Sequence, residues 1–223
     1  MGDKIMVVFD VTSETIEYLK TNGWEVYQSQ LHGHIHMYRL ITMYLTLSQL
    51  NRNYRYIITT DVRDVVFQKN PSEYLEKNLK NKILVSSENV KYKDEAWGTK
   101  NILEGYNDIL LQRYSDELSC NVGVLAGEYK AMMDLLLLNY LVSQAGNTEH
   151  YTDQSSFNFI IHNKLVTDSV QIEGLESPWA LQLGTINNPN LIGTHSIDID
   201  EYTIVHQYDR NSEINESITN RYL

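Results

Sequence analysis

The chain has 223 residues, of which 42% are hydrophobic and 21% charged, and its formal net charge is −11. This composition is typical of a globular protein and excludes an intrinsically disordered one. The acidic balance and the lack of any lysine and arginine cluster argue against a nucleic-acid partner, because phosphate binding needs a basic face.

The single cysteine, Cys120, excludes an internal disulfide and is typical of a reducing compartment. The sequence does not open with the basic and then apolar residues of a signal peptide, and it has no uncharged apolar stretch of about 18 residues. We therefore expect a cytoplasmic protein without a membrane span, and the sequence leaves its oligomeric state open.

Predicted strands and helices alternate along the chain. Short apolar runs rich in β-branched residues predict strands, and apolar residues three and four apart predict helices. The predicted strands are 4–11, 24–28, 56–60, 82–86, 121–126, 166–172 and 203–206. The predicted helices are one that starts at Thr12 or Ser13 and ends at Gly23, then 37–50, 71–79, 129–144 and 152–163.

This alternation predicts an α/β fold, with a mostly parallel central sheet and helices on both faces. The chain shows no linker, so we expect one domain over residues 1–223. In such sheets, ligands bind beyond the carboxyl ends of the strands. The segments that directly follow predicted strands are 11–13, 61–64, 87–89 and 206–209.

Two carboxylates, Asp61 and Asp64, come directly after the strand 56–60. Three residues apart in a turn, they can point to one place, where they repel each other unless a cation lies between them. Their oxygen atoms suit Mg²⁺ or Mn²⁺, and His206, at the end of a late strand, would favour Mn²⁺. Alternatively, Asp61 caps the following turn, Asp64 pairs with Arg63 and His206 is a core residue.

Polar residues near two other element ends suit a sugar ligand. Asn121 can hydrogen-bond to sugar hydroxyls, and Gly123 allows close approach of a ligand, although both also suit simple packing. Asp153 and Gln154 lie where the helix 152–163 begins, so Asp153 either faces an acceptor or belongs to an ordinary helix cap.

Several well-known motifs are absent. The sequence has no G-x-x-x-x-G-K-[ST] and no G-x-G-x-x-G, which excludes P-loop kinases and dinucleotide-dependent dehydrogenases. It also has no G-x-S-x-G, H-E-x-x-H or C-x-x-C.

Taken together, these segments resemble nucleotide-sugar glycosyltransferases of the GT-A fold. YRYIITTDVRDVVFQKNP (54–71) resembles the stretch that carries that family's Asp-x-Asp-type motif. Its Asp-x-x-Asp form is similar to that of the procollagen galactosyl- and glucosyltransferase domains and of related viral and bacterial transferases. Further matching segments follow in the family's order: LVSSEN (84–89), SCNVGVLAG (119–127), YTDQSSFN (151–158) and IVHQYD (204–209).

The resemblance implies transfer of a hexose-type sugar from a UDP-sugar to a hydroxyl on a glycan or protein. It implies that Asp61, Asp64 and His206 hold Mn²⁺, or Mg²⁺, on the donor diphosphate. The residues expected at the nucleotide sugar are Val11, Thr12, Arg39, Asp61, Arg63, Asn121 and Gly123. The residues expected at the reacting sugar are Asp153 and Gln154, with Asp153 as the candidate base and Glu88 and Asp209 as alternatives.

Some alternatives stay open. The family's motif carries an aromatic residue between its aspartates, where this chain has Val62 and Arg63, so recognition of the base is not settled. The N-terminal βα unit is either the family's first unit, shortened, or its second. The alternative functions are a non-catalytic module that binds glycans or a partner, and a sugar nucleotidyltransferase, although the chain lacks that enzyme's glycine- and lysine-rich loop.

Overall fold

The computed structural model describes residues 2–147, 149–166, 170–186 and 197–222. Its strands are β1 (Ile5–Phe9), β2 (Glu25–Ser29), β3 (Tyr56–Thr60), β4 (Val65–Phe67), β5 (Ile83–Lys91), β6 (Leu118–Glu128), β7 (Val170–Glu173), β8 (Ala180–Gln182) and β9 (Ile204–His206). Its α-helices are α1 (Ser13–Thr21), α2 (Ile35–Leu50), α3 (Pro71–Asn78), α4 (Ala96–Gly105), α5 (Asp108–Tyr114), α6 (Tyr129–Ala145), α7 (Asp153–His162) and α8 (Ser212–Tyr222). Short 3-10 turns are η1 (Tyr92–Asp94), η2 (Ile199–Glu201) and η3 (Tyr208–Arg210).

The central sheet has the strand order β3-β6-β5-β7. The long strand β6 runs antiparallel to both β3 and β5, whereas β5 and β7 are parallel. The predicted α/β fold is therefore confirmed, but this sheet is mixed and not mostly parallel. The reason is that β6 lies between two strands that run against it, a pairing between distant segments that local sequence patterns do not encode.

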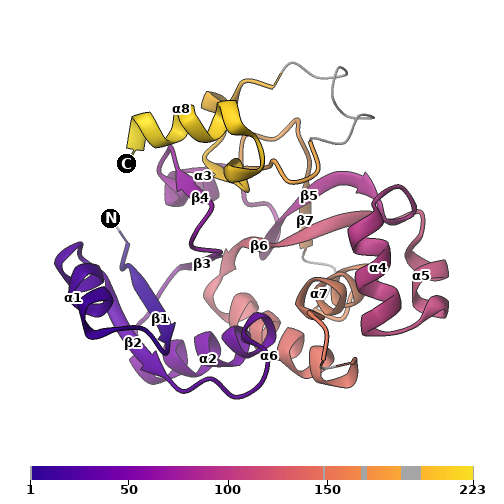
Figure 1. Ribbon diagram of the computed structural model, residues 1–223, viewed down its shortest axis with the longest axis horizontal. Coiled ribbons are helices and arrows are strands. Elements are labelled where there is room, and N and C mark those ends of the chain that lie inside the picture. The colour runs from indigo at the N-terminus through magenta and orange to yellow at the C-terminus, as the bar shows by residue number, and fades with distance from the viewer. Residues whose placement is uncertain (1, 148, 167–169, 187–196, 223) are drawn as a thin grey trace.

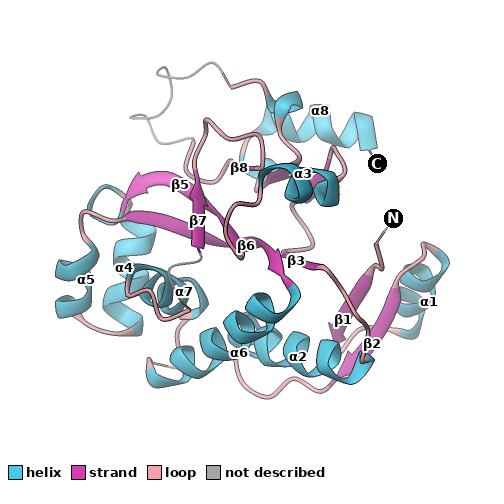
Figure 2. Ribbon diagram, turned by 180° about the vertical axis from the view of Figure 1, so that it is seen from behind, coloured by secondary structure: helices cyan, strands magenta, loops and turns pink. Residues whose placement is uncertain are grey.

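One face of the central sheet is covered by α2, α6 and α7 (Figures 1 and 2). Side chains alternate between the two faces along each strand. Ile83 and Val85 of β5 therefore join the core formed with these helices, and Leu84 joins the core on the opposite face. All three side chains are fully buried, and each such burial contributes about 1.5–3 kcal/mol to stability.

The opposite face of the central sheet is covered by α3 and by a smaller sheet with the strand order β4-β9-β8. The prediction of helices on both faces thus holds only in part, because a second sheet provides much of this layer. Trp179, just before β8, is fully buried here and packs against Tyr74 of α3 with ring centroids 5.1 Å apart. This packing fixes the position of β8 over the central sheet.

The N-terminal segment forms a βαβ unit in which β1 and β2 pair in parallel, as the alternation predicts. Thr12 begins α1 as its N-cap, because its Oγ1 accepts a hydrogen bond from the backbone N–H of Thr15 at 3.2 Å. Gly23, with φ of +81°, makes the turn into β2.

Several elements differ from the prediction. The strand predicted over 82–86 continues to Lys91, so residues 87–89 lie inside β5 and not after it, with a register shift between Val85 and Ser87. Residues 167–169 of the predicted strand 166–172 lie outside the described residues. Elements not predicted are β4, β8, α4, α5 and α8. In the part of the chain that the structure describes, no helix has the length and apolar character needed to cross a membrane.

Candidate metal centre and surrounding site

The turn 61–64 joins the two packed sheets. Asp61 directly follows β3, and its backbone N–H donates to the carbonyl oxygen of Gly123 in β6 at 2.8 Å. Asp64 directly precedes β4, whose first residue, Val65, is paired with His206 of β9. The chain thus leaves the central sheet at one aspartate and enters the smaller sheet at the other, beside His206.

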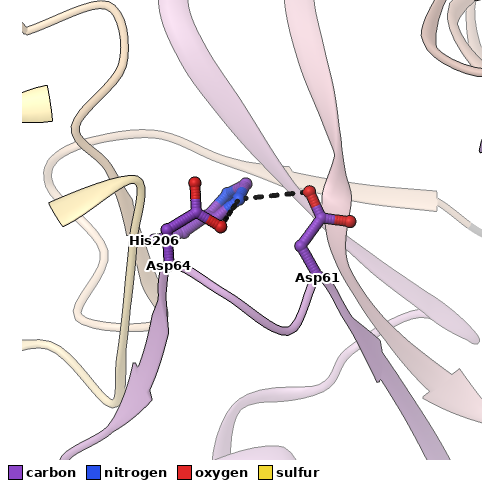
Figure 3. Close-up of side chains that lie close together, drawn as sticks. All are labelled: Asp61, Asp64 and His206. Atoms are coloured by element: carbon purple, nitrogen blue, oxygen red, sulfur yellow. Dashed lines mark ion pairs between the residues drawn. The ribbon is translucent and has the colours of Figure 1, made fainter. Parts of the chain in front are cut away.

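Asp61, Asp64 and His206 converge at this junction (Figure 3). His206 Nε2 lies 3.4 Å from Asp61 Oδ2 and 3.8 Å from Asp64 Oδ1. One ligand atom from each residue falls within 4.8 Å of the others. Ligands at roughly 2.0–2.6 Å from a divalent ion show about these mutual separations, so the three atoms could bind one metal ion.

Gly123 leaves the space that such an ion requires. A Cβ atom at this position would lie 2.8 Å from Asp61 Oδ2 and 2.9 Å from His206 Nε2. Any larger residue would therefore enter the gap between two of the three candidate ligands. The chemistry of the donor atoms and this gap both fit a divalent cation such as Mn²⁺ or Mg²⁺.

Arg39 of α2 bridges two carboxylates of the site. Its Nη1 contacts Asp61 Oδ1, and its Nη2 donates to Asp153 Oδ2 at 3.0 Å. Asp61 therefore offers one oxygen to Arg39 and turns the other towards His206. Burial raises the pKa of Asp61, but the hydrogen bond from His206 and the positive charge of Arg39 outweigh this effect and hold it well below its usual range.

A buried polar network lies under the site, on β5, β6 and α7. The carboxylate of Glu88 accepts hydrogen bonds from Ser119 Oγ at 2.7 Å and Asn121 Nδ2 at 2.8 Å, and from Gln154 Nε2 at 3.4 Å. Asn121 Oδ1 in turn accepts from the backbone N–H of Gly123 at 2.7 Å. Burial raises the pKa of Glu88, and these three donors lower it only in part. The network fixes Asn121 and Gln154 in place.

Arg63 and Asp209 pair with each other at the edge of the site. Arg63 is largely exposed, and its Nη2 lies 2.9 Å from Asp209 Oδ2 and 3.6 Å from Asp64 Oδ2. Asp209, one of the alternative candidates for the catalytic base, is thus engaged in an ion pair. Val11 and Thr12 precede α1, and the Thr12 side chain serves as the helix cap, so their contact with a nucleotide stays a prediction.

A cavity of about 180 Å³ lies beside the first turn of α2. Its lining is aromatic and polar: His32, Gly33, His34, Met37, Tyr38, Tyr140 and Gln144. Thr152 Oγ1 lies 2.8 Å from the sulfur of Met37, which joins the cavity wall to the start of α7. The ring of Tyr151 meets those of His34 and His36 edge to face, with centroids 4.5 and 5.1 Å apart. Sequence reasoning missed this cavity, although three histidines at alternate positions were a visible signal.

The comparisons with known proteins match this chain through its fold alone. No family model matches the sequence, and no curated protein matches it either. Among solved structures, the fold is similar to that of a glycosyltransferase involved in the glycosylation of the major capsid of PBCV-1. That likeness has a TM-score of 0.52 at 11% identity and covers 98% of this chain and 100% of the other.

The chain has a glycosyltransferase fold. A second similar structure is that of apo WbbM, a bifunctional glycosyltransferase, with a TM-score of 0.46 at 14% identity, covering 86% of this chain and 37% of the other. The first of these likenesses confirms the GT-A-like fold expected from the sequence. The candidate metal centre occupies the junction of the two sheets within it.

Proposed function

We propose that this chain is a metal-dependent glycosyltransferase that moves a hexose-type sugar from a UDP-sugar to a hydroxyl group of a glycan or protein. The observation that carries the proposal is the convergence of Asp61, Asp64 and His206 at the sheet junction, in a glycosyltransferase fold. The transferase is proposed to be one domain over residues 1–223.

Sugar transfer breaks the bond between the anomeric carbon and the diphosphate, and negative charge develops on the leaving group. A bound Mn²⁺ or Mg²⁺ ion stabilises that charge without a proton transfer. In this proposal, Asp61, Asp64 and His206 would hold the ion. Arg39 lies beside them and adds a positive charge that two carboxylates keep in place. Arg63, Val11 and Thr12 are proposed to contact the nucleotide.

The donor sugar is proposed to lie against Asn121, Gly123 and Gln154. Asn121 and Gln154 are buried amides held by Glu88, so their orientation is fixed before a ligand binds. Preorganised hydrogen-bonding groups of this kind cost little free energy when they bind a substrate. Glu88 itself accepts three hydrogen bonds and is 6% exposed, which argues against its use as the base.

Asp153 is the proposed base if the anomeric centre inverts. It stands at the start of α7 beside Arg39, and its neighbour Thr152 contacts the wall of the aromatic cavity. We place the acceptor sugar in that cavity, because tyrosine and histidine rings stack well on sugar rings while Gln144 can hydrogen-bond to hydroxyls.

The test is to incubate the chain with a panel of nucleotide sugars, with Mn²⁺ and with a chelator, and to measure release of nucleoside diphosphate. We expect metal-dependent release that Asp61→Asn abolishes. Asp134→Asn is the matched control, because Asp134 is an exposed aspartate on α6 paired with Lys130 at 3.1 Å. Formation of pyrophosphate would identify a nucleotidyltransferase, and failure of calorimetry to detect metal-dependent UDP binding would identify a non-catalytic module.

A further inference from the structure

A buried glutamine contacts the far side of the His206 ring. Gln182 Oε1 lies 2.7 Å from His206 Nδ1, and the two residues are 2% and 1% exposed. They are register partners in the parallel pair β8-β9, where the backbone N–H of Leu183 also donates to the carbonyl oxygen of His206 at 3.0 Å. The contact is therefore built into the pairing of two strands.

The strand that carries Gln182 is held firmly in place. Trp179 and Leu181 are fully buried, and Trp179 packs on Tyr74 of α3. Neither Gln182 nor His206 can change its position without disturbing this packing, because tightly packed interiors resist small displacements. The distance between the two side chains is thus set by the fold.

This contact determines which nitrogen of His206 carries the hydrogen. An amide oxygen accepts and cannot donate, so Nδ1 bears the hydrogen and donates it to Gln182. Nε2 is then the nitrogen that can offer its lone pair to a cation in the gap between Asp61 and Asp64. A histidine that binds a metal through one nitrogen commonly donates its other ring N–H to such a partner.

We infer that Gln182 is a positioning residue that sets the tautomer and the orientation of His206 so that Nε2 faces the cation site. The inference rests on the proposed metal centre, but not on sugar transfer. The Nε2 of Gln182 has no hydrogen-bond partner among the described residues, although it is buried. An amide with one unpaired polar atom is costly in a core, which argues that its other atom has a specific use.

The first test measures Mn²⁺ affinity by calorimetry, without any nucleotide. Gln182→Met removes the acceptor at similar size, and we expect binding to weaken about 10–100-fold. Gln182→Glu keeps an acceptor oxygen and should restore binding to within a few fold of the unchanged chain. Gln171→Met, which removes a glutamine from β7, is the control for general loss of hydrogen bonds and should bind normally.

The second test reads the tautomer directly. In metal-free protein labelled with ¹⁵N-histidine, the imidazole spectrum should show His206 with a hydrogen on Nδ1, and the signal is assigned by its loss in His206→Asn. This measurement needs neither metal nor substrate, so it separates failure of the inference from failure of the proposed function. A neutral His206 ring with its hydrogen on Nε2 and none on Nδ1, or unweakened Mn²⁺ binding by folded Gln182→Met, would overturn the inference. If Gln182→Met does not fold, the tautomer and the Gln182→Glu affinity still decide it.

Discussion

Substitution of Gly123 by alanine tests whether the gap at the sheet junction is a cation site. The added Cβ would lie 2.8 Å from Asp61 Oδ2 and 2.9 Å from His206 Nε2, whereas comfortable contacts with carbon are about 3.5 Å. The added Cβ would also collide with Cε1 of His206, so the His206 ring, the Asp61 side chain or both must move. The substitution thus displaces at least one candidate ligand while leaving the chemistry of both intact.

We expect Gly123→Ala to weaken Mn²⁺ binding about 10–100-fold, which corresponds to about 1.4–2.7 kcal/mol of binding free energy. Overpacking should also lower the free energy of unfolding by about 1–3 kcal/mol. Calorimetric titration with Mn²⁺ and urea unfolding, both on the same preparation, separate the two effects. Wild-type Mn²⁺ affinity in a folded Gly123→Ala variant would refute the reasoning.

Gly127→Ala is the matched control for this experiment. Gly127 lies in the same strand, and a Cβ there would collide with the carbonyl oxygen of Lys82 and lie 3.1 Å from Ile83 Cα. We expect this variant to lose stability and to keep its Mn²⁺ affinity. An equal loss of Mn²⁺ affinity in both variants would mean that the effect travels through general destabilisation of β6.

Three further outcomes can be checked. His206→Ala should weaken Mn²⁺ binding while leaving metal-free UDP binding unchanged, as measured by calorimetry with and without the ion; an unaltered Mn²⁺ dependence would remove His206 from the site. In urea titrations, Arg39→Lys should lower the free energy of unfolding by about 1–2 kcal/mol, because one ammonium group cannot reproduce the bridge between two carboxylates. The control Arg55→Lys, at an exposed ion pair, should change it by less than about 0.5 kcal/mol. Burial lowers the pKa of His162, and the nearby carboxylate of Glu117 offsets this effect only in part. Below pH about 6.5 the folded chain therefore binds fewer protons than the unfolded chain, so the free energy of unfolding should fall as the pH drops through that value. His162→Gln should flatten this fall in melting temperature between pH 8 and 5, and an unchanged slope would contradict the assignment.

The apolar part of the fold follows from sequence patterns, and the polar part does not. The β-branched run of β3 predicts that strand with its observed bounds, and the apolar spacing of α6 predicts that helix closely. The predicted end of β5, at Ser86, was wrong. Ser87 and Glu88 are polar, and polar residues usually mark the end of a buried strand. Here hydrogen bonds, and not apolar contacts, hold these side chains inside.

The short strands of the smaller sheet show the same limit. Strand β4 and strand β8 have three residues each, too few to show any alternation of polar and apolar side chains. Their existence depends on pairing with β9, which lies far along the chain from β4. Such pairings form because the whole sheet assembles, so neither strand could be identified from its own residues.

The candidate site divides in a similar way. The convergence of Asp61, Asp64 and His206 was predictable, because the turn 61–64 and His206 both lie at the ends of predicted strands, although they meet between two sheets and not at the edge of one. The contacts that orient these three side chains could not be predicted from the sequence. Arg39 reaches Asp61 across 22 residues and Asp153 across 114, and Gln182 reaches His206 from a strand that was not predicted. These partners are set by tertiary packing.

The balance of charge explains why the proposed function needs a divalent ion. Arg39 is shared between Asp61 and Asp153, and Arg63 lies between Asp64 and Asp209, so carboxylates outnumber guanidinium groups among these residues. Unit charges no more than 4.8 Å apart repel by at least about 3 kcal/mol at an effective dielectric constant near 20. A donor diphosphate brings further negative charge to the same place. Arg39 and Arg63 each already serve two carboxylates, so they leave that charge uncompensated, whereas a cation held by Asp61 and Asp64 would offset both their repulsion and the charge of the diphosphate.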